Sequence, residues 1–433
     1  MKRLTHGLAQ TIVALLLSVN SASAQRTPSG SGPPRVFVDC QAVFGCDLDY
    51  LRTEIPYVDY MRDRSDANIH VLITRQSTGG GGTEYTFNFI GLRDFAGITD
   101  TLQFATPQTA TDDDRRKGFA RTIKLGLVRY IARTPGAERL QISYEKPAAG
   151  APKAGDKPAH DPWNFWVFRT RANGNFSGES SQRFTYINGS VSANRVTKEW
   201  KISNSFSVNY NESKFTFNEG EVFRSYSRGY GASQLVAKSL NDHWSVGERS
   251  SLSSSTYLNT KRSLRIAPAI EYNFYPYSQS TRKLVTLQYS AGVNSYRYRD
   301  TTIFEKLSEV RPNHALIAAI SMTQPWGSVS GSVEGSSYLD DLSKRRLVVF
   351  QEVNARLFKG FSFNMYGGLS LLRDQIYLAK GGATDEEILL QRKQLATSYS
   401  YFAGLGLTYT FGSIFNNVVN PRFQEGGGTF VSN

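Results

Sequence analysis

Two histidines, His243 and His314, are the residues in this sequence whose chemistry could most readily support catalysis. An imidazole activates a serine hydroxyl for ester hydrolysis when the two groups are hydrogen-bonded and a third group orients the ring. His243 lies in the turn-like segment 241–244, and His314 follows a Pro-Asn pair. Serine is so frequent here that some serine near some histidine is expected by chance, and neither histidine accompanies a Gly-x-Ser-x-Gly elbow. We therefore expect turn or interface roles, and no catalytic residues.

The chain has only two cysteines, Cys40 and Cys46. In an oxidising compartment two thiols this close can pair as a disulfide, and the alternative is two buried thiols. A metal site is not expected because the histidines are scattered along the chain. They are His6, His70, His160, His243 and His314.

Three other groups of residues have chemistry that we weigh against simpler roles. The glycines at 79–82 could cradle a phosphate, but no Lys-Ser/Thr follows them, so a flexible hairpin turn is expected. Asp47 and Asp49 could contact calcium, yet two carboxylates without further spaced ligands indicate helix capping instead. The acidic run at 385–387 either binds divalent cations near lipopolysaccharide or is a solvated loop. We predict no cofactor.

The N-terminus has the pattern of an export signal. Two basic residues follow Met1, an apolar stretch covers 12–19, and Ala22-Ser-Ala24 precedes Gln25. This pattern predicts a signal peptide over 1–24, and the alternative, a buried N-terminal helix, lacks a comparable apolar segment to pack against. Beyond it the chain has nothing near the roughly 18 consecutive apolar residues of a spanning helix, so the mature protein is either secreted or a β-barrel.

Composition favours the β interpretation. The chain has 433 residues, with 23 Tyr, 26 Phe, 37 Gly and a formal net charge of +13. Many aromatic residues and glycines suit a large antiparallel β structure. The export signal argues against nucleic acid as the partner of the positive charge. Lipopolysaccharide phosphates or an anion-favouring lumen are the expected partners, unless most of the charge is solvated surface.

The N-terminal part reads as a flexible leader (25–34), an α/β domain (35–146) and a linker (147–162) rich in Ala, Pro, Gly and Lys. In the helix expected to start at Asp112, the apolar residues Phe119, Ile123, Leu127 and Ile131 recur every four residues and form one core-facing stripe. The expected strands are 36–38, 69–74, 86–90, 102–105 and 140–144, and the expected helices are 47–55 and 112–133.

This arrangement resembles the amino-terminal domain of the TolB family. The resemblance covers about 70 residues, and it depends on 67–74, the glycine turn and the helix end Leu-Val-Arg-Tyr-Ile at 127–131. It implies a periplasmic α/β adaptor.

From Trp163 onward the sequence is a series of amphipathic β segments separated by turn residues. In 361–371 every odd position is apolar or glycine and most even positions are small or polar. Such alternation over 12 to 19 residues predicts a transmembrane barrel at 163–412, since strands of a soluble β-sandwich are nearer five or six residues long. The twelve expected strands are 164–177, 182–195, 199–211, 223–238, 243–258, 262–276, 283–298, 308–323, 327–338, 345–358, 360–378 and 396–411.

The same segments predict which residues meet lipid, water and turns. Arg346, Glu352 and Arg356 alternate with apolar residues, which places charges of both signs in the lumen. Lys359-Gly360 is expected as a tight periplasmic turn, whereas 301–307 and 379–394 are expected as extracellular loops. Aromatic residues that collect at segment ends would form interfacial girdles. They are Trp163, Trp166, Trp200, Trp244, Trp326, Tyr272, Phe274 and Tyr277.

The strand series, ending in Leu405-Gly-Leu-Thr-Tyr-Thr-Phe411, resembles the salt-induced outer-membrane protein family, whose function is unknown. The resemblance covers about 250 residues and implies an outer-membrane barrel. Such barrels commonly end at an aromatic last residue, but this chain continues to Asn433. Either the barrel ends at Phe411 and 413–433 is a periplasmic tail, or Phe415 belongs to the last strand.

Together these features predict a non-enzymatic protein of the cell outer membrane, in contact with outer-membrane lipid and lipopolysaccharide. The first hypothesis is a narrow channel for small solutes or ions, in which Arg346 and Arg356 favour anions. The second is a structural anchor that presents the periplasmic domain to a protein partner. The third is an outer-membrane lipid hydrolase that uses His243 or His314.

Overall fold

The computed structural model describes residues 32–40, 46–143, 161–216, 222–381, 395–420 and 422. The predicted signal peptide, most of the leader and the linker, the acidic run at 385–387 and the end of the tail lie outside these residues. The α/β region and the large sheet belong to one structural unit that begins at Pro34.

The α/β region contains a five-stranded sheet with the order β2-β1-β3-β4-β5. β1 runs parallel to β2 and β3, and β3, β4 and β5 are antiparallel neighbours. The first four predicted strands are confirmed within a few residues, and β2 was not predicted. The strands are β1 (Arg35–Asp39), β2 (Asp59–Tyr60), β3 (Ile69–Ser77), β4 (Thr83–Gly91) and β5 (Thr99–Thr106).

The fifth predicted strand, 140–144, is wrong over its described residues. The 3₁₀ helix η3 (Pro135–Arg139) comes first, and the Leu140 N–H donates to Ala137 O as that helix ends. Leu140–Ser143 then has no strand partner, and Ile142 is 74% exposed. The Leu140 N–H that would begin the ladder is already used, and beyond Leu140, which packs partly against the core, the side chains of 141–143 are exposed.

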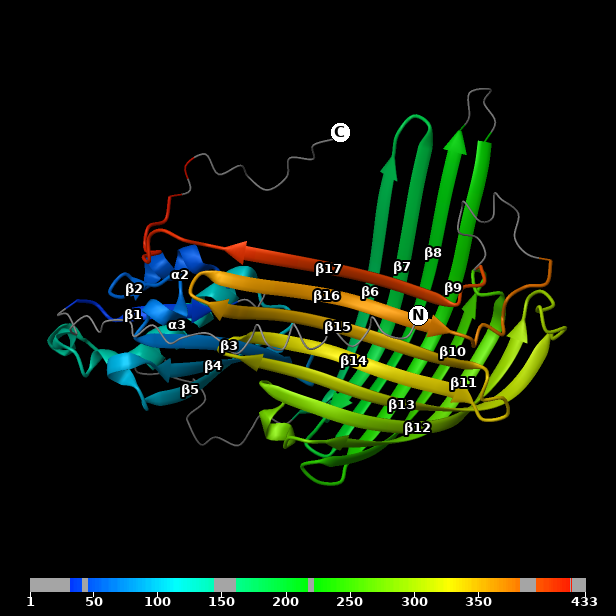
Figure 1. The fold of residues 1–433 in the computed structure, drawn as a ribbon, viewed down its shortest axis with the longest axis horizontal. Helices are drawn as coiled ribbons and strands as arrows, with labels where there is room; N and C mark the ends of the chain where they lie inside the picture. Colours follow the sequence, from blue (N-terminus) through cyan, green and yellow to red (C-terminus); the bar gives the residue numbers. More distant parts are fainter. Residues whose placement is uncertain are drawn as a thin grey trace, which may run out of the picture. The chain divides into compact units, whose positions relative to one another are not determined.

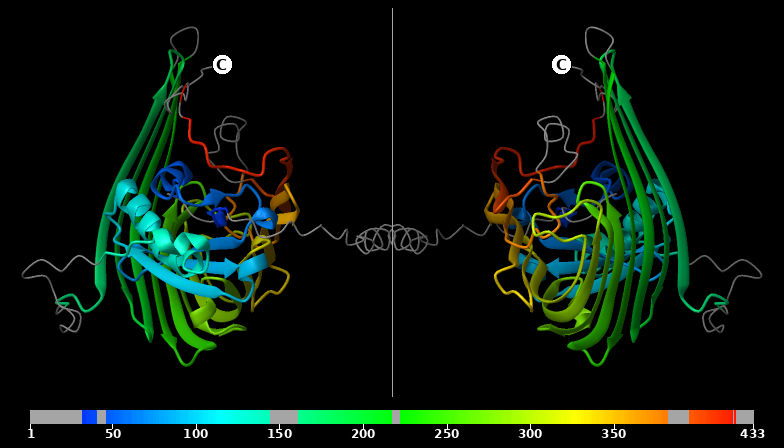
Figure 2. Two further views of the ribbon diagram at one scale, coloured as in Figure 1. Left: turned by 90° about the vertical axis from the view of Figure 1, so that its left-hand side faces the viewer. Right: turned by 90° about the vertical axis from the view of Figure 1, so that its right-hand side faces the viewer.

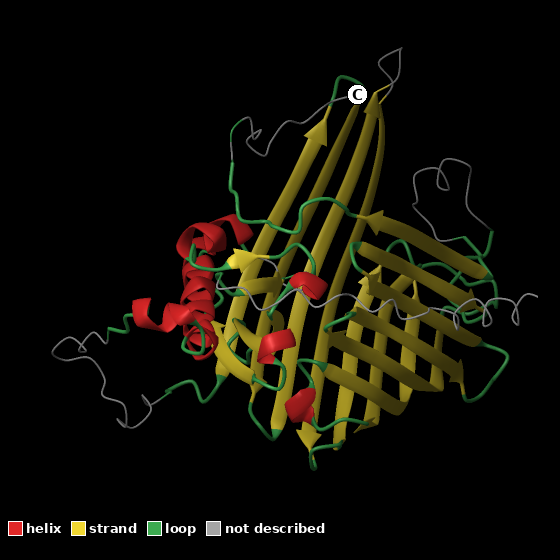
Figure 3. Cartoon of the chain, turned by 60° about the vertical axis from the view of Figure 1, so that its left-hand side comes forward, coloured by secondary structure: helices red, strands yellow, loops and turns green. Residues whose placement is uncertain are grey.

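Two helices complete this region, and both are capped as their sequences imply. The Asp47 carboxylate accepts from Tyr50 N at the start of α2 (Leu48–Glu54), which confirms its predicted capping role. Thr111 and Asp114 form a capping box at the start of α3 (Asp112–Ile131). Figure 3 shows α3 as the long helix of the chain.

The predicted apolar stripe of α3 is buried against the five-stranded sheet. Phe119 and Leu127 are fully covered, and the Phe119 ring lies edge-on to Phe87 with centroids 5.1 Å apart. Tyr130, one residue before the end of the helix, donates its hydroxyl to Phe89 O. Burial of each such side chain contributes about 1.5–3 kcal/mol, so this stripe holds the helix on the sheet.

Cys40 and Cys46 form a disulfide, which confirms the predicted pairing. The bond joins the end of β1 to the residue before Asp47, the cap of α2. It therefore cross-links the end of the first strand to the start of the first helix.

After the linker, twelve antiparallel strands form one sheet in which every strand pairs with its neighbours in sequence (Figure 1). The number, order and antiparallel pairing of the predicted strands are confirmed, and even the shortest, β17, has the 11 residues that a barrel strand needs. The strands are β6 (Trp166–Gly178), β7 (Gln182–Val196), β8 (Trp200–Thr216), β9 (Val222–Ser239), β10 (Trp244–Ser255), β11 (Thr260–Asn273), β12 (Lys283–Tyr298), β13 (Ser308–Gln324), β14 (Gly327–Tyr338), β15 (Arg345–Phe358), β16 (Phe361–Leu372) and β17 (Tyr399–Tyr409).

The eleventh strand, predicted over 360–378, is shorter than expected. β16 ends at Leu372 because its partner strand β15 offers no residue beyond Arg345. The chain then turns, and Ile376 is buried within a loop at 1% exposure.

The sheet is curved and twisted but not closed. In Figure 1, β6–β9 run steeply while β13–β17 run nearly across the view, and Figure 2 shows the curvature from two sides. Among the described residues, β6 pairs with β7 alone and β17 with β16 alone, so these strands are the two edges. Of the helices that the structure describes, none has the length and apolar character needed to span a bilayer.

The two ends of the strands differ in their connections. At one end, which we call the turn end, two-residue turns at 325–326 and 359–360 join neighbouring strands. At the other, which we call the loop end, longer segments at 299–307, 339–344 and 373–398 connect them. The longest connection, 373–398, lies at the loop end, but the turn end also has the nine-residue segment 274–282 and the loop end also has the short turn 179–181.

Two adjacent rows of residues, which point to opposite faces of the sheet, differ in polarity. One face, which we call the polar face, carries an unbroken row of polar residues in direct register across β7–β13. The adjacent row on the opposite, apolar face has only apolar residues over β7–β11. The polar row is Ser192, Ser205, Ser233, Ser251, Arg265, Asn294 and Arg311, and the apolar row is Val191, Phe206, Ala232, Leu252 and Leu264.

Along β12 the burial of the two faces is inverted relative to a soluble protein. On β12 the polar-face residues Ser290 and Asn294 are 5% and 3% exposed. On the same strand the apolar-face residues Leu287 and Val293 are 39% and 49% exposed. Large apolar side chains thus point outward over a wide area, far more than a water-soluble surface normally presents.

All five tryptophans lie at or next to the turn end, in strand starts or turns. On the apolar face there, Trp244 packs against Tyr272 with ring centroids 4.8 Å apart, and Phe361 lies 6.4 Å from Tyr409. Several residues of the predicted aromatic girdle therefore lie near this end, although Tyr277 contacts Ser245 and Glu271 on the polar face.

The last strand ends at Tyr409, so Phe415 does not belong to it. Phe415 instead bridges Met61 in the α/β region, and Asn416 N donates to Tyr60 O. Of the two alternatives for the tail, the structure supports the one in which the strand ends near Phe411.

Candidate functional site

The α/β region meets the turn end of the large sheet through an ion pair between Asp39 and Arg356. Arg356 Nη1 donates to Asp39 Oδ2 at 2.6 Å, and Nη2 donates to Oδ1 at 2.7 Å. Asp39 is 5% exposed, and the Arg356 side chain is 18% exposed. A bidentate, largely buried pair of this kind fixes both distance and orientation.

Strand alternation explains why Asp39 reaches this position. Along β1, Val36 and Val38 pack into the core beneath the helices, so Phe37 and Asp39 point to the other face. Arg356 lies near the end of β15, and its guanidinium stands 5.2 Å from the centre of the Phe37 ring. The second face of the small sheet is therefore covered by the end of the large one.

His70 lies behind the ion pair and is fully buried. Its Nε2 lies 3.3 Å from Asp39 Oδ2, and its ring packs 5.3 Å from Phe37. Burial raises the pKa of Asp39, but hydrogen bonds from His70 and Arg356 outweigh it and lower that pKa to about 2. Burial lowers the pKa of His70, and the nearby Asp39 opposes this only in part.

A second set of contacts holds the 359–360 turn of the large sheet. Lys359 Nζ lies 2.7 Å from Asp66 Oδ1, and Gly360 N donates to Asp63 Oδ2 at 2.7 Å. Burial raises the pKa of Asp63, but hydrogen bonds from Ser65 and Gly360 outweigh it and lower that pKa. Together with the Asp39–Arg356 pair and the Phe415 bridge, these contacts attach the α/β region at three places at this end.

A cleft of about 440 Å³ lies between Asp39 and the polar face of the large sheet. Its walls combine Leu72 of β3 with polar side chains of β14–β16, among them Asn354, Asn364 and Arg356. The α/β region thus occupies space in front of the polar face but leaves room for water or a small solute.

The three predicted lumen charges lie on the polar face of β15, but the structure does not bring them together. Arg346 at the loop end lies 3.7 Å from Asp374, whereas Arg356 at the turn end pairs with Asp39. Glu352 accepts from Asn354 Nδ2 at 3.1 Å. Both arginines are thus paired with carboxylates, which weakens the expectation that they favour anions.

The loop end is also partly covered. Residues near 300 and 378 pair through a Thr302–Ala379 bridge, and Ile303 N donates to Leu378 O at 2.8 Å. The Asn259 side chain donates to Asp300 O and Tyr377 O, tying both segments to the β10–β11 turn. The remaining residues of the predicted 379–394 loop, 382–394, lie outside the described residues.

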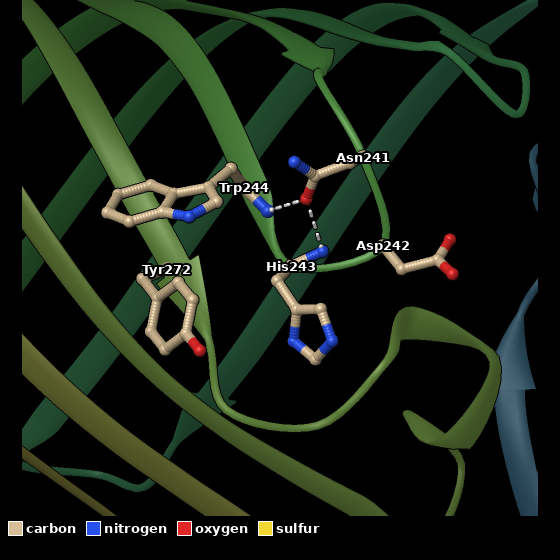
Figure 4. Close-up of a pocket in the computed structure, with 5 residues that line it drawn as sticks. All are labelled: Asn241, Asp242, His243, Trp244 and Tyr272. Atoms are coloured by element: carbon tan, nitrogen blue, oxygen red, sulfur yellow. Dashed lines mark hydrogen bonds between the residues drawn. The ribbon is translucent and has the colours of Figure 1, made fainter.

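His243 lines an open pocket of about 510 Å³ with Asn241, Asp242, Trp244 and Tyr272 (Figure 4). Its Nδ1 lies 2.7 Å from Asn273 O, and its backbone N–H donates to Asn241 Oδ1. The pocket lining contains no serine, and Asp242 points away from the ring in Figure 4. His243 therefore has the geometry of a turn residue.

His314 is different, because a serine and a tyrosine contact its two ring nitrogens. Nε2 lies 2.8 Å from Ser337 Oγ, and Nδ1 lies 3.3 Å from the Tyr289 hydroxyl. The three side chains come from neighbouring strands β12, β13 and β14 and lie on the apolar face.

Sequence reasoning missed Asp39, His70 and Asp63 as site residues. The only local signal for Asp39 is that a carboxylate ends an otherwise apolar strand. Its partner Arg356 is 317 positions away in sequence, so no local pattern could identify the pair.

No three His, Cys, Asp or Glu side chains gather as a metal site within the described ranges. No family model matches this chain, and no curated protein matches it.

Proposed function

We propose that this chain is an outer-membrane β-barrel protein that provides a narrow passage, with the α/β region seated at its periplasmic mouth. The observation that carries the proposal is the inverted burial of the two faces along β12, where polar-face residues are covered and apolar-face residues are exposed. Apolar side chains on the outward face need a lipid environment, and a buried polar face suits a water-containing lumen. The long strands and the aromatic side chains near the turn end support the same assignment.

A membrane location requires the two edge strands to pair. In hydrocarbon an unpaired strand edge costs several kcal/mol for each unsatisfied backbone group. Twelve is an even number, so β6 and β17 run antiparallel and are oriented to close the sheet.

The passage is narrow in this proposal because both ends are restricted. A barrel of about this size leaves little space beyond its own side chains. The Asp39–Arg356 pair lies at the turn end, and the paired 300 and 378 segments lie at the loop end. We propose that movement of the α/β region controls the first restriction.

Location is tested by fractionation and by mobility on denaturing gels. We expect the protein in the outer-membrane fraction, with a mobility that shifts when the detergent sample is heated. A freely soluble protein without a heat-dependent shift contradicts the barrel.

Conductance tests the role of the ion pair. In planar bilayers, Arg356→Gln should raise the conductance of the folded protein, because an unpaired buried Asp39 costs about 3 kcal/mol and loosens the α/β region. The same variant should become more sensitive to protease near the linker. The matched control is Arg265→Gln, a polar-face arginine for which the described residues offer no ion-pair partner. If Arg356→Gln and the wild type have equal conductance, the α/β region does not restrict the passage.

The attachment of the α/β region also favours a second function, an envelope anchor that presents this region to a protein partner. Contacts at three places hold it at one end of the sheet. Crosslinking from the exposed Leu125 position on α3 should then recover a specific periplasmic protein, and no crosslinked partner would count against the anchor.

A further inference from the structure

The strongest unassigned group of side chains is Tyr289, His314 and Ser337. Its residues come from three adjacent strands and meet on the apolar face of the sheet. Ser337 stands directly opposite His314 in the strand register, and Tyr289 lies one diagonal step away on β12. Neighbouring strands hold the three backbones in place, so their separation does not depend on a loop.

The two distances fit a chemical order of the three groups in the tautomer that carries the ring proton on His314 Nδ1. The Ser337 hydroxyl donates to His314 Nε2 at 2.8 Å, and His314 Nδ1–H then donates to the Tyr289 oxygen at 3.3 Å. In this tautomer the ring is a base toward serine, and tyrosine positions it. A nucleophile hydrogen-bonded to a base that a third group orients is the arrangement of serine hydrolases.

The location indicates what such a nucleophile would meet. Ser337 is the second-last residue of β14, so it lies at the loop end, where the apolar face ends. Leu316 and Val293 on the same face are 47% and 49% exposed, and exposed Arg345 stands directly opposite Ser337 on β15. A membrane phospholipid would place its acyl chains along the apolar side chains, its ester near Ser337 and its phosphate near Arg345.

A histidine on a lipid-facing surface calls for an explanation, because polar side chains there are costly and usually functional. Hydrogen bonds to Ser337 and Tyr289 satisfy the ring, but they do not explain why a histidine stands there instead of a leucine.

We propose that Ser337 and His314 form a catalytic pair that hydrolyses carboxylic esters of membrane phospholipids. Ser337 Oγ attacks the ester carbonyl carbon while His314 Nε2 takes the hydroxyl proton. The tetrahedral intermediate collapses with cleavage of the carbonyl carbon to glycerol oxygen bond, and His314 returns the proton to the leaving alcohol. Water then attacks the acyl-serine, His314 again takes and returns a proton, and fatty acid and free Ser337 result.

This assignment departs from the non-enzymatic expectation from sequence, and its lipid substrate rests on the proposed membrane location. The heat-dependent mobility shift is therefore recorded for every sample, because it reports the barrel independently of hydrolysis.

The test uses the full chain in detergent, with mixed micelles of phosphatidylglycerol as substrate and a fluorophosphonate as serine label. We expect fatty acid release and label on Ser337 identified by mass spectrometry. Ser337→Ala and His314→Ala should each lower the rate at least about 100-fold and abolish labelling. The matched control Ser336→Ala changes the neighbouring serine, which faces the polar side, and should retain both activities.

Tyr289 is a positioning residue, and its variant separates orientation from binding. Tyr289→Phe should lower kcat about tenfold with little change in KM, because the ring loses one hydrogen bond and the apolar surface stays. A wild-type protein that shows the heat shift but neither hydrolysis nor label overturns the proposal. Label on another serine, or full activity in folded Ser337→Ala, overturns it as well.

Discussion

At the scale of single residues, the contact between the α/β region and the large sheet depends on buried polar groups that form hydrogen bonds with one another. Asp39 is held as a carboxylate between Arg356 and His70, and His70 has no exposed surface. Removal of one member leaves a buried charge or an unpaired polar group, which costs more than the intact contact contributes.

The buried histidine makes the stability of the α/β region depend on pH. Burial lowers the pKa of folded His70 below its usual 6.5, although Asp39 faces it along with Arg64 and Arg356. Because the unfolded chain binds a proton near pH 6.5 and the folded chain resists it, stability is full above pH 6.5 and falls as pH decreases. Asp39, with a pKa of about 2, loses its contribution only below its ordinary 3.8.

Between pH 7 and pH 5 we therefore expect the urea midpoint for protease cleavage of the α/β region to fall. The measurement uses the full chain in detergent. His70→Gln keeps a donor for Asp39 but cannot titrate, so its midpoint should change less over the same interval. Equal shifts for the two proteins would show that His70 is not the titrating group.

At the scale of elements, the tight β15–β16 turn at the turn end of the sheet contacts the α/β region. The β15–β16 turn has Gly360 at φ +74°, and its N–H is the donor to Asp63. A side chain at this φ is strained, and an added methyl group would also overlap the Thr410 carbonyl oxygen.

Gly360→Ala should destabilise the folded chain by about 1–3 kcal/mol, the usual cost of a left-handed non-glycine residue. Its matched control is Gly335→Ala on β14, where no atom lies within 4 Å of the added methyl group. Urea unfolding in detergent, followed by the heat-dependent shift, measures both variants. If Gly360→Ala leaves the free energy of unfolding unchanged, the turn can rearrange without a loss of stability.

At the scale of the whole molecule, the two faces of the large sheet decide which solvent each side requires. Phe206 and Ser205 are neighbours on β8, both exposed, and they point to opposite faces. If both positions faced water, a charged side chain would be tolerated equally well at each. If Phe206 faces lipid, a charge there is destabilising, whereas a charge at Ser205 is not.

Phe206→Lys should therefore cost about 2–4 kcal/mol in a bilayer, whereas Ser205→Lys should cost little. Reversible unfolding in lipid vesicles gives the two values. Equal costs for the two lysines would contradict the assignment of the apolar face to lipid.

The sequence by itself determined the local elements of this protein. Alternation over long segments predicted twelve strands, a four-residue apolar step predicted α3, and the lack of further spaced ligands beside Asp47 indicated that it caps a helix. These features depend on neighbours a few residues apart, which is why a single sequence contains them. The prediction failed at 140–144, where the described residues form no strand, and at the end of β16, where the strand ends for lack of a partner residue.

Only the tertiary structure decided which distant side chains meet. Asp39 reaches Arg356 across 317 positions, and His314 reaches Ser337 because the register of β13 and β14 sets them opposite each other. A shift of that register by one residue would place Ser337 on the other face. Strand pattern determines which face a residue occupies, but the pairing of strands and the docking of the α/β region determine its partners.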